Sequence, residues 1–300
     1  MTPAARGIDV GVIGLGAMGG PIARNLVAAG LRVAGYDLDY SRREALATSG
    51  GEVYASVEAL AAEAPVILTL LPSPAALEDV TAGIARAVGG CSEKPVLVEM
   101  STLSEATKQR ARDALEPLGV AVLDCPLSGT AVQAVAGDLV IYASGDDADI
   151  DRCQPVFSRM ARGVHRLGPF GTGTRTKLVA NLLVAVHIVS AAEALVLARA
   201  AGLDLDRTLA ALTDGAGSSR MLEVRGPMMV DETFDAPSMT LRLFAKDENL
   251  IREFAAALEV PVPLFEDASR VLRRAANEGR AEQDTSAVYA SLADELSSRT

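Results

Sequence analysis

The chain has 300 residues, 49% of them hydrophobic, so it is long enough for two domains with cores of their own. Its formal net charge of −11 leaves no basic stripe to meet phosphates, and we expect no nucleic-acid partner. The cysteines Cys91, Cys125 and Cys153 have no metal-ligand spacing. An odd cysteine count without a recognisable signal peptide predicts a cytoplasmic location, and we expect no metal centre.

A glycine-rich segment near the N-terminus carries the strongest signal in the sequence. The expected strand Val10–Ile13 runs into residues 14–19 (GLGAMG), and a helical pattern over Pro21–Ala29 follows. This is the strand, turn and helix order of a dinucleotide-binding site.

Each residue of this turn has an expected task at the phosphates. Gly14 allows a tight turn, Gly16 lets the backbone approach a pyrophosphate, and Gly19 lets the helix pack close to the strand. Ala17 and Met18 stand at the helix start, where unpaired N–H groups meet the phosphate charge.

The next expected strand, Arg32–Tyr36, ends in Asp37, at the distance where an acid holds a ribose 2′-OH. The carboxylate would repel a 2′-phosphate, so Asp37 favours NAD. Arg42 and Arg43 follow closely, and they leave NADP open.

The first half of the chain alternates short apolar runs with helical patterns. This alternation predicts an α/β fold, with a parallel, doubly wound Rossmann-type sheet in a first domain of residues 1–168. The further expected strands are Val66–Leu70, Val96–Glu99, Val120–Leu123, Leu139–Ala143 and an edge strand at Val164–Leu167. The expected helices between them are Arg42–Ser49, Val57–Glu63, Ala75–Val88 and Ser104–Leu118.

Loops after the strands should face the nucleotide. Leu71 and Pro72 follow one strand, and Ser101 and Thr102 follow another. The hydroxyls of the second pair could contact the nicotinamide ribose or cap the next helix.

The segment Asp124–Ala131 follows a strand and precedes a helix. Its residues Ser128, Gly129 and Thr130 offer hydroxyls and backbone N–H groups, which suit a substrate carboxylate. An ordinary structural turn is the alternative.

After Gly168 the strand signals vanish, and a second, all-helical domain of residues 169–300 is expected. A long helix from Thr174 joins the two domains. The stretch Leu178–Ala198 is apolar enough to span a bilayer, but Asn181 and Glu193 would be costly in lipid. We expect no membrane partner, and a homodimer or homotetramer with this helix at its interface. The shorter helices expected beyond it are Asp206–Leu212, Arg220–Met228, Leu241–Leu258, Pro263–Glu278 and Thr285–Leu296.

Lys177 and Asn181 are four residues apart and therefore share one face of an otherwise apolar helix. A buried lysine tends toward a lowered pKa, which suits proton transfer near neutral pH, and the asparagine can hold a substrate hydroxyl. The alternative is a lysine that snorkels from a helix start. On a later helix, Lys246 and Asp247 could reach the cofactor or the substrate, unless they belong to a solvated face.

Taken in order, these motifs resemble the β-hydroxyacid dehydrogenase family, whose members include 3-hydroxyisobutyrate dehydrogenase and tartronate semialdehyde reductase. The resemblance covers nearly the whole chain, and it implies a C-terminal domain like that of 6-phosphogluconate dehydrogenase. It rests on residues 14–19 with Pro21 and Asn25, on Asp124–Gly129, on Gly171 and Gly173 with Lys177 and Asn181, on Lys246-Asp247, and on Asp284–Val288.

The resemblance implies that Lys177 is the catalytic general acid/base and that Asn181 binds the substrate. It also implies that Ser128 and Gly129 hold the substrate carboxylate, with Lys246 near the nicotinamide.

Two positions depart from the family pattern. Thr130 replaces a glycine in the carboxylate loop, and Ala180 replaces an asparagine before Asn181. The stretch Gly215–Met221 is closer to family members that act on sugar acids such as threonate.

These features predict an oxidoreductase that transfers a hydride between NAD(P) and a small 3-hydroxy carboxylic acid resembling 3-hydroxyisobutyrate. A sugar acid such as threonate, glycerate or tartronate semialdehyde is the alternative substrate. An imine reductase and a non-catalytic nucleotide-binding scaffold are rival functions, and the presence of Lys177 disfavours both.

Overall fold

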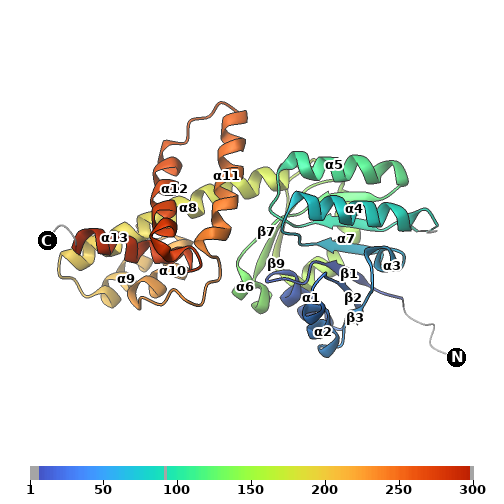
Figure 1. Ribbon diagram of the computed structural model, residues 1–300, viewed down its shortest axis with the longest axis horizontal. Helices are drawn as coiled ribbons and strands as arrows, with labels where there is room; N and C mark the ends of the chain where they lie inside the picture. Colours follow the sequence, from blue (N-terminus) through green and yellow to red (C-terminus); the bar gives the residue numbers. More distant parts are fainter. Residues whose placement is uncertain (1–6, 91–92, 298–300) are drawn as a thin grey trace. The chain divides into compact units, whose positions relative to one another are not determined.

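The structure is a computed structural model that describes residues 7–90 and 93–297 (Figure 1). The chain forms two compact units, Met1–Lys177 and Leu178–Thr300. The division lies later than Gly168, where the sequence pattern places it, because helix α8 (Thr172–Ala200) begins in the first unit and continues into the second.

A six-stranded parallel sheet is the centre of the first unit. Its strand order is β3-β2-β1-β4-β5-β6, and every pair of neighbours is parallel. The order reverses between β1 and β4, and a Rossmann-type sheet binds its ligand at the carboxyl ends of the strands beside that point. The bounds are β1 (Val10–Ile13), β2 (Val33–Tyr36), β3 (Glu52–Val53), β4 (Val66–Thr69), β5 (Val96–Glu99) and β6 (Ala121–Asp124).

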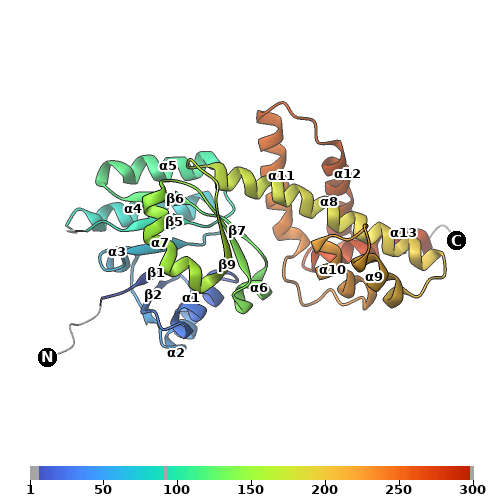
Figure 2. The same cartoon turned by 180° about the vertical axis from the view of Figure 1, so that it is seen from behind.

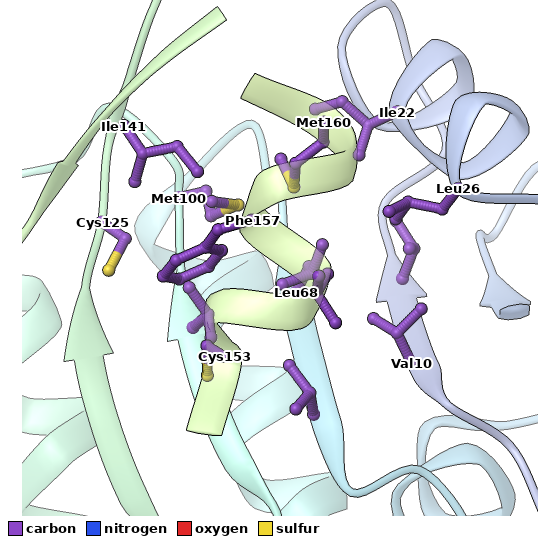
Figure 3. Packing of buried hydrophobic residues seen from close by; sticks show 14 of the residues in the cluster. Val10, Ile22, Leu26, Leu68, Met100, Cys125, Ile141, Cys153, Phe157 and Met160 are labelled. Atoms are coloured by element: carbon purple, nitrogen blue, oxygen red, sulfur yellow. The ribbon is translucent and has the colours of Figure 1, made fainter. Parts of the chain in front are cut away.

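Helices cover both faces of this sheet, because alternate strand side chains point to opposite sides. Val10 and Val12 belong to one core cluster, whereas Ile13 belongs to the other. Figure 3 shows the first cluster, where Phe157 and Met160 lie near Leu68 of the sheet. The helices of this unit before α8 are α1 (Gly19–Ala28), α2 (Tyr40–Thr48), α3 (Val57–Ala61), α4 (Pro74–Val88), α5 (Glu105–Leu115) with a 3₁₀ turn at Glu116–Leu118, α6 (Ala131–Ala136) and α7 (Asp147–Met160).

The last three strands of the unit form a separate sheet in the order β7-β8-β9. β7 (Leu127–Ser128) is antiparallel to β8 (Leu139–Ala143), and β8 is parallel to β9 (Ala161–Arg166). The sequence-based assignment of Leu139–Ala143 and Val164–Leu167 to the main sheet is therefore wrong. The chain turns back after β6, and Asp124 forms an antiparallel bridge with Ser144 instead of continuing the parallel order.

Helix α7 is also absent from the predicted helices, because Pro155 and its polar residues obscure the helical pattern.

The second unit continues α8 and adds helices around one apolar cluster of its own. Figure 2 shows these helices from behind. The named elements of its described residues are all helical, as expected for this half of the chain. They are α9 (Leu205–Asp214), α10 (Arg220–Val230), α11 (Leu241–Ala257), α12 (Pro263–Ala275), a π-helical turn at Ala276–Arg280, a 3₁₀ turn at Thr285–Ala287, and α13 (Val288–Ser297).

Helix α8 is long and apolar enough to cross a bilayer by length and composition alone, a test that core helices of soluble proteins also pass.

Cys125 and Cys153 are buried free thiols, and Cys91 lies outside the described residues. Within residues 7–90 and 93–297, no group of three or more His, Cys, Asp or Glu side chains is placed to hold a metal ion.

Candidate active site

The glycine-rich turn between β1 and α1 has the geometry that its spacing predicts. Gly14 has φ +92°, and a Cβ there would lie 2.3 Å from the carbonyl oxygen of Leu70. A Cβ on Gly19 would lie 1.9 Å from the carbonyl oxygen of Gly14, so the helix and strand are in direct contact. A Cβ on Gly16 would meet nothing closer than 3.5 Å. Gly16 is partly exposed and its nearest neighbour is the flexible end of the Arg42 side chain, so a pyrophosphate could approach the backbone here.

The first turn of α1 follows directly, and in it the Gly20 N–H donates to the Gly16 carbonyl at 2.9 Å while Pro21 has no N–H. Met18 occupies the cap position without a side-chain cap hydrogen bond, and Ala17 before it is exposed. A helix start without a side-chain cap, together with the helix dipole, favours a bound phosphate. The residues present therefore fit a dinucleotide.

Asp37 follows β2 and lies beside this turn. One of its oxygens accepts a hydrogen bond from the Leu15 N–H at 2.7 Å, and the other accepts one from the Asp39 N–H at 2.9 Å. The Arg42 guanidinium lies 3.4 Å from the first oxygen. The carboxylate is thus fixed by the glycine turn itself. The oxygen that accepts from Asp39 has one further lone pair that a ribose hydroxyl can use, whereas the other oxygen accepts from both Leu15 and Arg42.

The loops after β4 and β5 are joined to one another. The hydroxyl of Ser101 accepts a hydrogen bond from the Leu71 N–H at 2.8 Å, and Ser101 is buried. Ser104, and not Ser101, caps α5. Pro72 is exposed, and Leu71 and Thr102 are partly exposed.

The expected carboxylate loop lies between β7 and α6. Ser128 ends β7 and is partly exposed, and Gly129 has φ +136°. The Thr130 N–H donates to the side-chain oxygen of Gln133 at 3.0 Å, so this N–H is already used within the loop. The Ser128 hydroxyl and the Gly129 N–H are the better donors for a carboxylate.

Lys177 lies in the second turn of α8. Its side chain is half-buried, less than the apolar composition of the helix predicts. Lys177 is the last residue of the first unit, and Asn181 follows one helical turn later.

In the second unit, the Asn181 side chain is fixed by α11. Its amide nitrogen donates to the Asp247 carboxylate at 2.8 Å, and both side chains are buried. The Lys246 ammonium lies 3.8 Å from the other oxygen of Asp247, and the Lys246 side chain is 46% exposed. The structure brings together Asn181, Lys246 and Asp247, which lie in two separate motifs of the sequence.

One cluster of buried charges was not among the expected site residues. Lys108 of α5 lies between Glu99 and Asp124, and all three side chains are buried. A signal for it exists, because Lys108 occupies the inward stripe of α5 with Ala111 and Leu115. A charge at such a position requires buried partners.

Comparisons with known proteins match both halves of the chain to family models of NAD-binding dehydrogenase domains. The family model described as the NAD binding domain of 6-phosphogluconate dehydrogenase matches residues 9–168. The model described as NAD-binding of NADP-dependent 3-hydroxyisobutyrate dehydrogenase matches residues 171–292.

Individual relatives match along nearly their whole length. L-threonate dehydrogenase of Escherichia coli K12 is 34% identical over 281 residues, covering 93% of each chain. The 2-hydroxy-3-oxopropionate reductase of the same organism is 31% identical over 285 residues, covering 95% of this chain and 97% of that one. The crystal structure of 3-hydroxyisobutyrate dehydrogenase from Salmonella typhimurium has a TM-score of 0.82 at 35% identity, covering 94% of this chain and 99% of that one.

Two matching family models, relatives of this similarity and a Rossmann-type sheet with a helical second unit lead to the same conclusion. The chain belongs to the β-hydroxyacid dehydrogenase family and is an NAD(P)-dependent 3-hydroxyacid dehydrogenase.

Proposed function

We propose that the substrate is a sugar acid of the threonate class and that Lys177 is the general acid/base. These roles rest mainly on Asn181. Asp247 holds its side-chain amide in one orientation, and Asn181 lies one helical turn from Lys177 on the same helix face. The sugar-acid choice is supported by the 34% identity to L-threonate dehydrogenase and by the Gly215–Met221 stretch. A second candidate is 3-hydroxyisobutyrate, which the 35% identical Salmonella structure favours.

The nicotinamide cofactor supplies the hydride acceptor. During oxidation the neutral Lys177 amine takes the proton of the substrate hydroxyl while the C–H bond gives up its hydride. The products are a carbonyl acid, reduced cofactor and a protonated lysine. In the reverse direction the Lys177 ammonium returns its proton to the forming alkoxide.

The remaining side chains bind and orient. Ser128 Oγ and the Gly129 N–H hold the carboxylate, with Thr130 shaping the loop. The fixed amide of Asn181 holds a substrate hydroxyl, and its partner Asp247 sets the amide's orientation. Lys246 is assigned to the nicotinamide side of the substrate. The cofactor is held by the turn at Gly14, Gly16, Ala17, Met18 and Gly19, by Asp37, and by the loops of Leu71, Pro72, Ser101 and Thr102.

We assign the protein to the cytoplasm as a homodimer or homotetramer. Val179 and Leu183 of α8 are 54% and 48% exposed, and they share one helix face. Exposed apolar side chains in such a row support an interface between copies. Light scattering coupled to size exclusion gives the mass directly, and a monomer at micromolar concentration would exclude this assembly.

A turnover screen of the native enzyme and a Lys177→Met variant tests the proposed function. We expect the highest kcat/KM with threonate among threonate, glycerate, 3-hydroxyisobutyrate and serine. Loss of the proton acceptor should lower kcat by about two to four powers of ten, while NADH binding is retained. Arg199→Met removes an exposed cation from the same helix and should leave kcat unchanged.

Near-native turnover of the Lys177→Met variant with full cofactor binding would exclude the assigned role. Preference for 3-hydroxyisobutyrate would replace the substrate and leave the chemistry intact. Reduction of a cyclic imine, or cofactor binding without any turnover, would favour the two rival functions.

A further inference from the structure

Three ionisable side chains are fully enclosed at one end of the main sheet. Glu99 ends β5, Asp124 ends β6, and Lys108 lies on α5; their side chains are 0%, 0% and 1% exposed. The Lys108 ammonium lies 2.8 Å from one oxygen of each carboxylate. Removing charges from water is costly, and apolar residues of similar size would stabilise a fold as well. The cluster therefore calls for an explanation other than stability.

The charge balance of the cluster depends on Lys108. Burial by itself would lower the pKa of Lys108, but the negative charges of Asp124 and Glu99 outweigh it and raise the pKa above its usual value. Two carboxylates share one ammonium, so the cluster carries a net charge of −1. Without the ammonium, the two buried carboxylates would face each other with no cation between them.

The two carboxylates also accept hydrogen bonds from backbone N–H groups. Asp124 accepts hydrogen bonds from the Thr174 N–H at 2.7 Å and from the Thr174 hydroxyl at 2.8 Å. Glu99 accepts one from the Ser101 N–H at 3.0 Å. Asp124 thus fixes the first turn of α8, and Glu99 fixes the loop that follows β5.

The first turn of α8 packs directly against the backbone of β6 and β8. A Cβ on Gly173 would lie 2.4 Å from the carbonyl oxygen of Tyr142 and 2.6 Å from that of Asp124. The Gly173 N–H also donates to the hydroxyl of Ser144 at 3.0 Å. The start of α8 is therefore held on several sides, and Lys177 follows Thr174 by three residues, within one turn.

We propose that Lys108 is a positioning residue: through its 2.8 Å ion pair it holds the Asp124 carboxylate in place, which fixes the first turn of α8 and thereby the position of Lys177. The proposal rests on the proposed function, in which Lys177 is the general acid/base. Proton transfer requires a narrow range of donor–acceptor geometry, and a displacement of about 1 Å can cost on the order of 100-fold in rate. Lys108 acts on turnover without touching the substrate.

A charge-balanced pair of variants tests this role. Lys108→Met leaves two buried carboxylates without a cation, so the hydrogen bonds that Asp124 accepts from Thr174 should weaken. We expect kcat per NADH-binding site to fall about 10- to 100-fold, with KM for the nicotinamide cofactor unchanged. The double variant Glu99→Gln/Lys108→Met has the native net charge and leaves Asp124 as the one carboxylate. It should recover kcat to within about threefold of the native value, since no second charge competes with Asp124.

A second variant covers the case in which Lys108→Met does not fold. Thr174→Val removes the hydroxyl bond to Asp124 and keeps the backbone bond, and it should lower kcat several-fold at unchanged cofactor KM. The matched control is Thr107→Val, a buried threonine next to Lys108 whose hydroxyl contacts Ser104 at 2.9 Å. The control should retain native kcat.

The outcomes separate the two proposals. If Lys108→Met lowers only the melting temperature, with native kcat per NADH-binding site, the cluster is structural and the positioning role fails. Native kcat in Thr174→Val, or no recovery in the double variant, overturns it as well. If Lys177→Met keeps its turnover in the same assay, the proposed function fails first, whatever Lys108 does.

Discussion

At the scale of single residues, Asp37, which we propose as the ribose contact, is held in place by the backbone around it. Its oxygens are hydrogen-bonded to the Leu15 and Asp39 N–H groups, which join the end of β2 to the glycine turn. The spacing of Asp37 after the second strand could be predicted from the sequence. Its bond to Leu15 could not, because the two residues are 22 positions apart and meet only when β1 and β2 pair.

Asp37→Asn should shift the enzyme from NAD toward NADP. The substitution removes the charge that repels a 2′-phosphate and weakens the bond to the ribose, while an amide oxygen still accepts one backbone N–H. A hydrogen bond to a charged group contributes about 1.5–3 kcal/mol, so the ratio of kcat/KM for NAD over NADP should fall by about 10- to 100-fold. Steady-state kinetics with both cofactors measure this ratio.

The control for this substitution is Asp39→Asn, which changes a nearby exposed carboxylate that caps α2. Its cofactor ratio should stay close to the native one. A native enzyme that strongly prefers NADP would contradict the role of Asp37, as would an unchanged ratio in Asp37→Asn.

At the scale of elements, the sequence predicts the position of a strand more readily than the neighbouring strand with which it pairs. The apolar run Leu139–Ala143 identifies β8, but a single strand does not state which neighbour it pairs with. Its partner β7 has two residues, too few for a periodic pattern. The separation of the second sheet from the first therefore depends on contacts after β6 that no local pattern encodes.

Asn25 links two elements that the sequence treats separately. Its amide donates to the carbonyl oxygens of Ala134 at 2.7 Å and Val135 at 3.2 Å, near the end of α6. The last carbonyl groups of a helix have no partner within it, and α6 has only six residues. Asn25 of α1 thus stabilises the helix that follows the carboxylate loop.

Asn25→Ala should therefore weaken substrate binding without affecting the cofactor. A net loss of about 1 kcal/mol for each of the two hydrogen bonds predicts a rise of about 5- to 30-fold in KM for the acid, with KM for NAD unchanged. Hydrogen exchange over residues 127–137 should become faster. Arg24→Ala, at the exposed neighbouring position, serves as the control. An unchanged KM for the acid would show that α6 holds the loop without Asn25.

At the scale of the whole molecule, the chain contains separate apolar cores in its two units. Their existence could be predicted from the change of pattern after Gly168. The charges enclosed in the first unit could not, because Glu99, Lys108 and Asp124 come from three elements. The first unit also encloses two free thiols, Cys125 and Cys153.

Both thiols titrate abnormally because they are buried in the first core cluster (Figure 3). Burial raises the pKa of Cys153 from its usual 9.0 to about 12, and that of Cys125 well above its usual value. The folded state therefore keeps these protons at a pH where the unfolded chain loses them. Their contribution to stability is complete below pH 9 and declines as the pH rises from 9 toward 12.

Cys153→Ala should separate this effect from the titration of other groups. At pH 7 the variant should be less stable by about 1 kcal/mol, because it loses the packing of a buried sulfur atom. Above pH 9 the native protein should lose this advantage by about 1.4 kcal/mol per pH unit, since the variant has no thiol at position 153 to ionise on unfolding. Urea unfolding at pH 7, 9, 10 and 11 measures the difference in the free energy of unfolding. Ser158→Ala, at an exposed position of α7, should give a difference that does not change with pH. A difference that stays constant from pH 7 to 11 for Cys153→Ala would show that the folded core does not raise the pKa of this thiol, and would contradict the prediction.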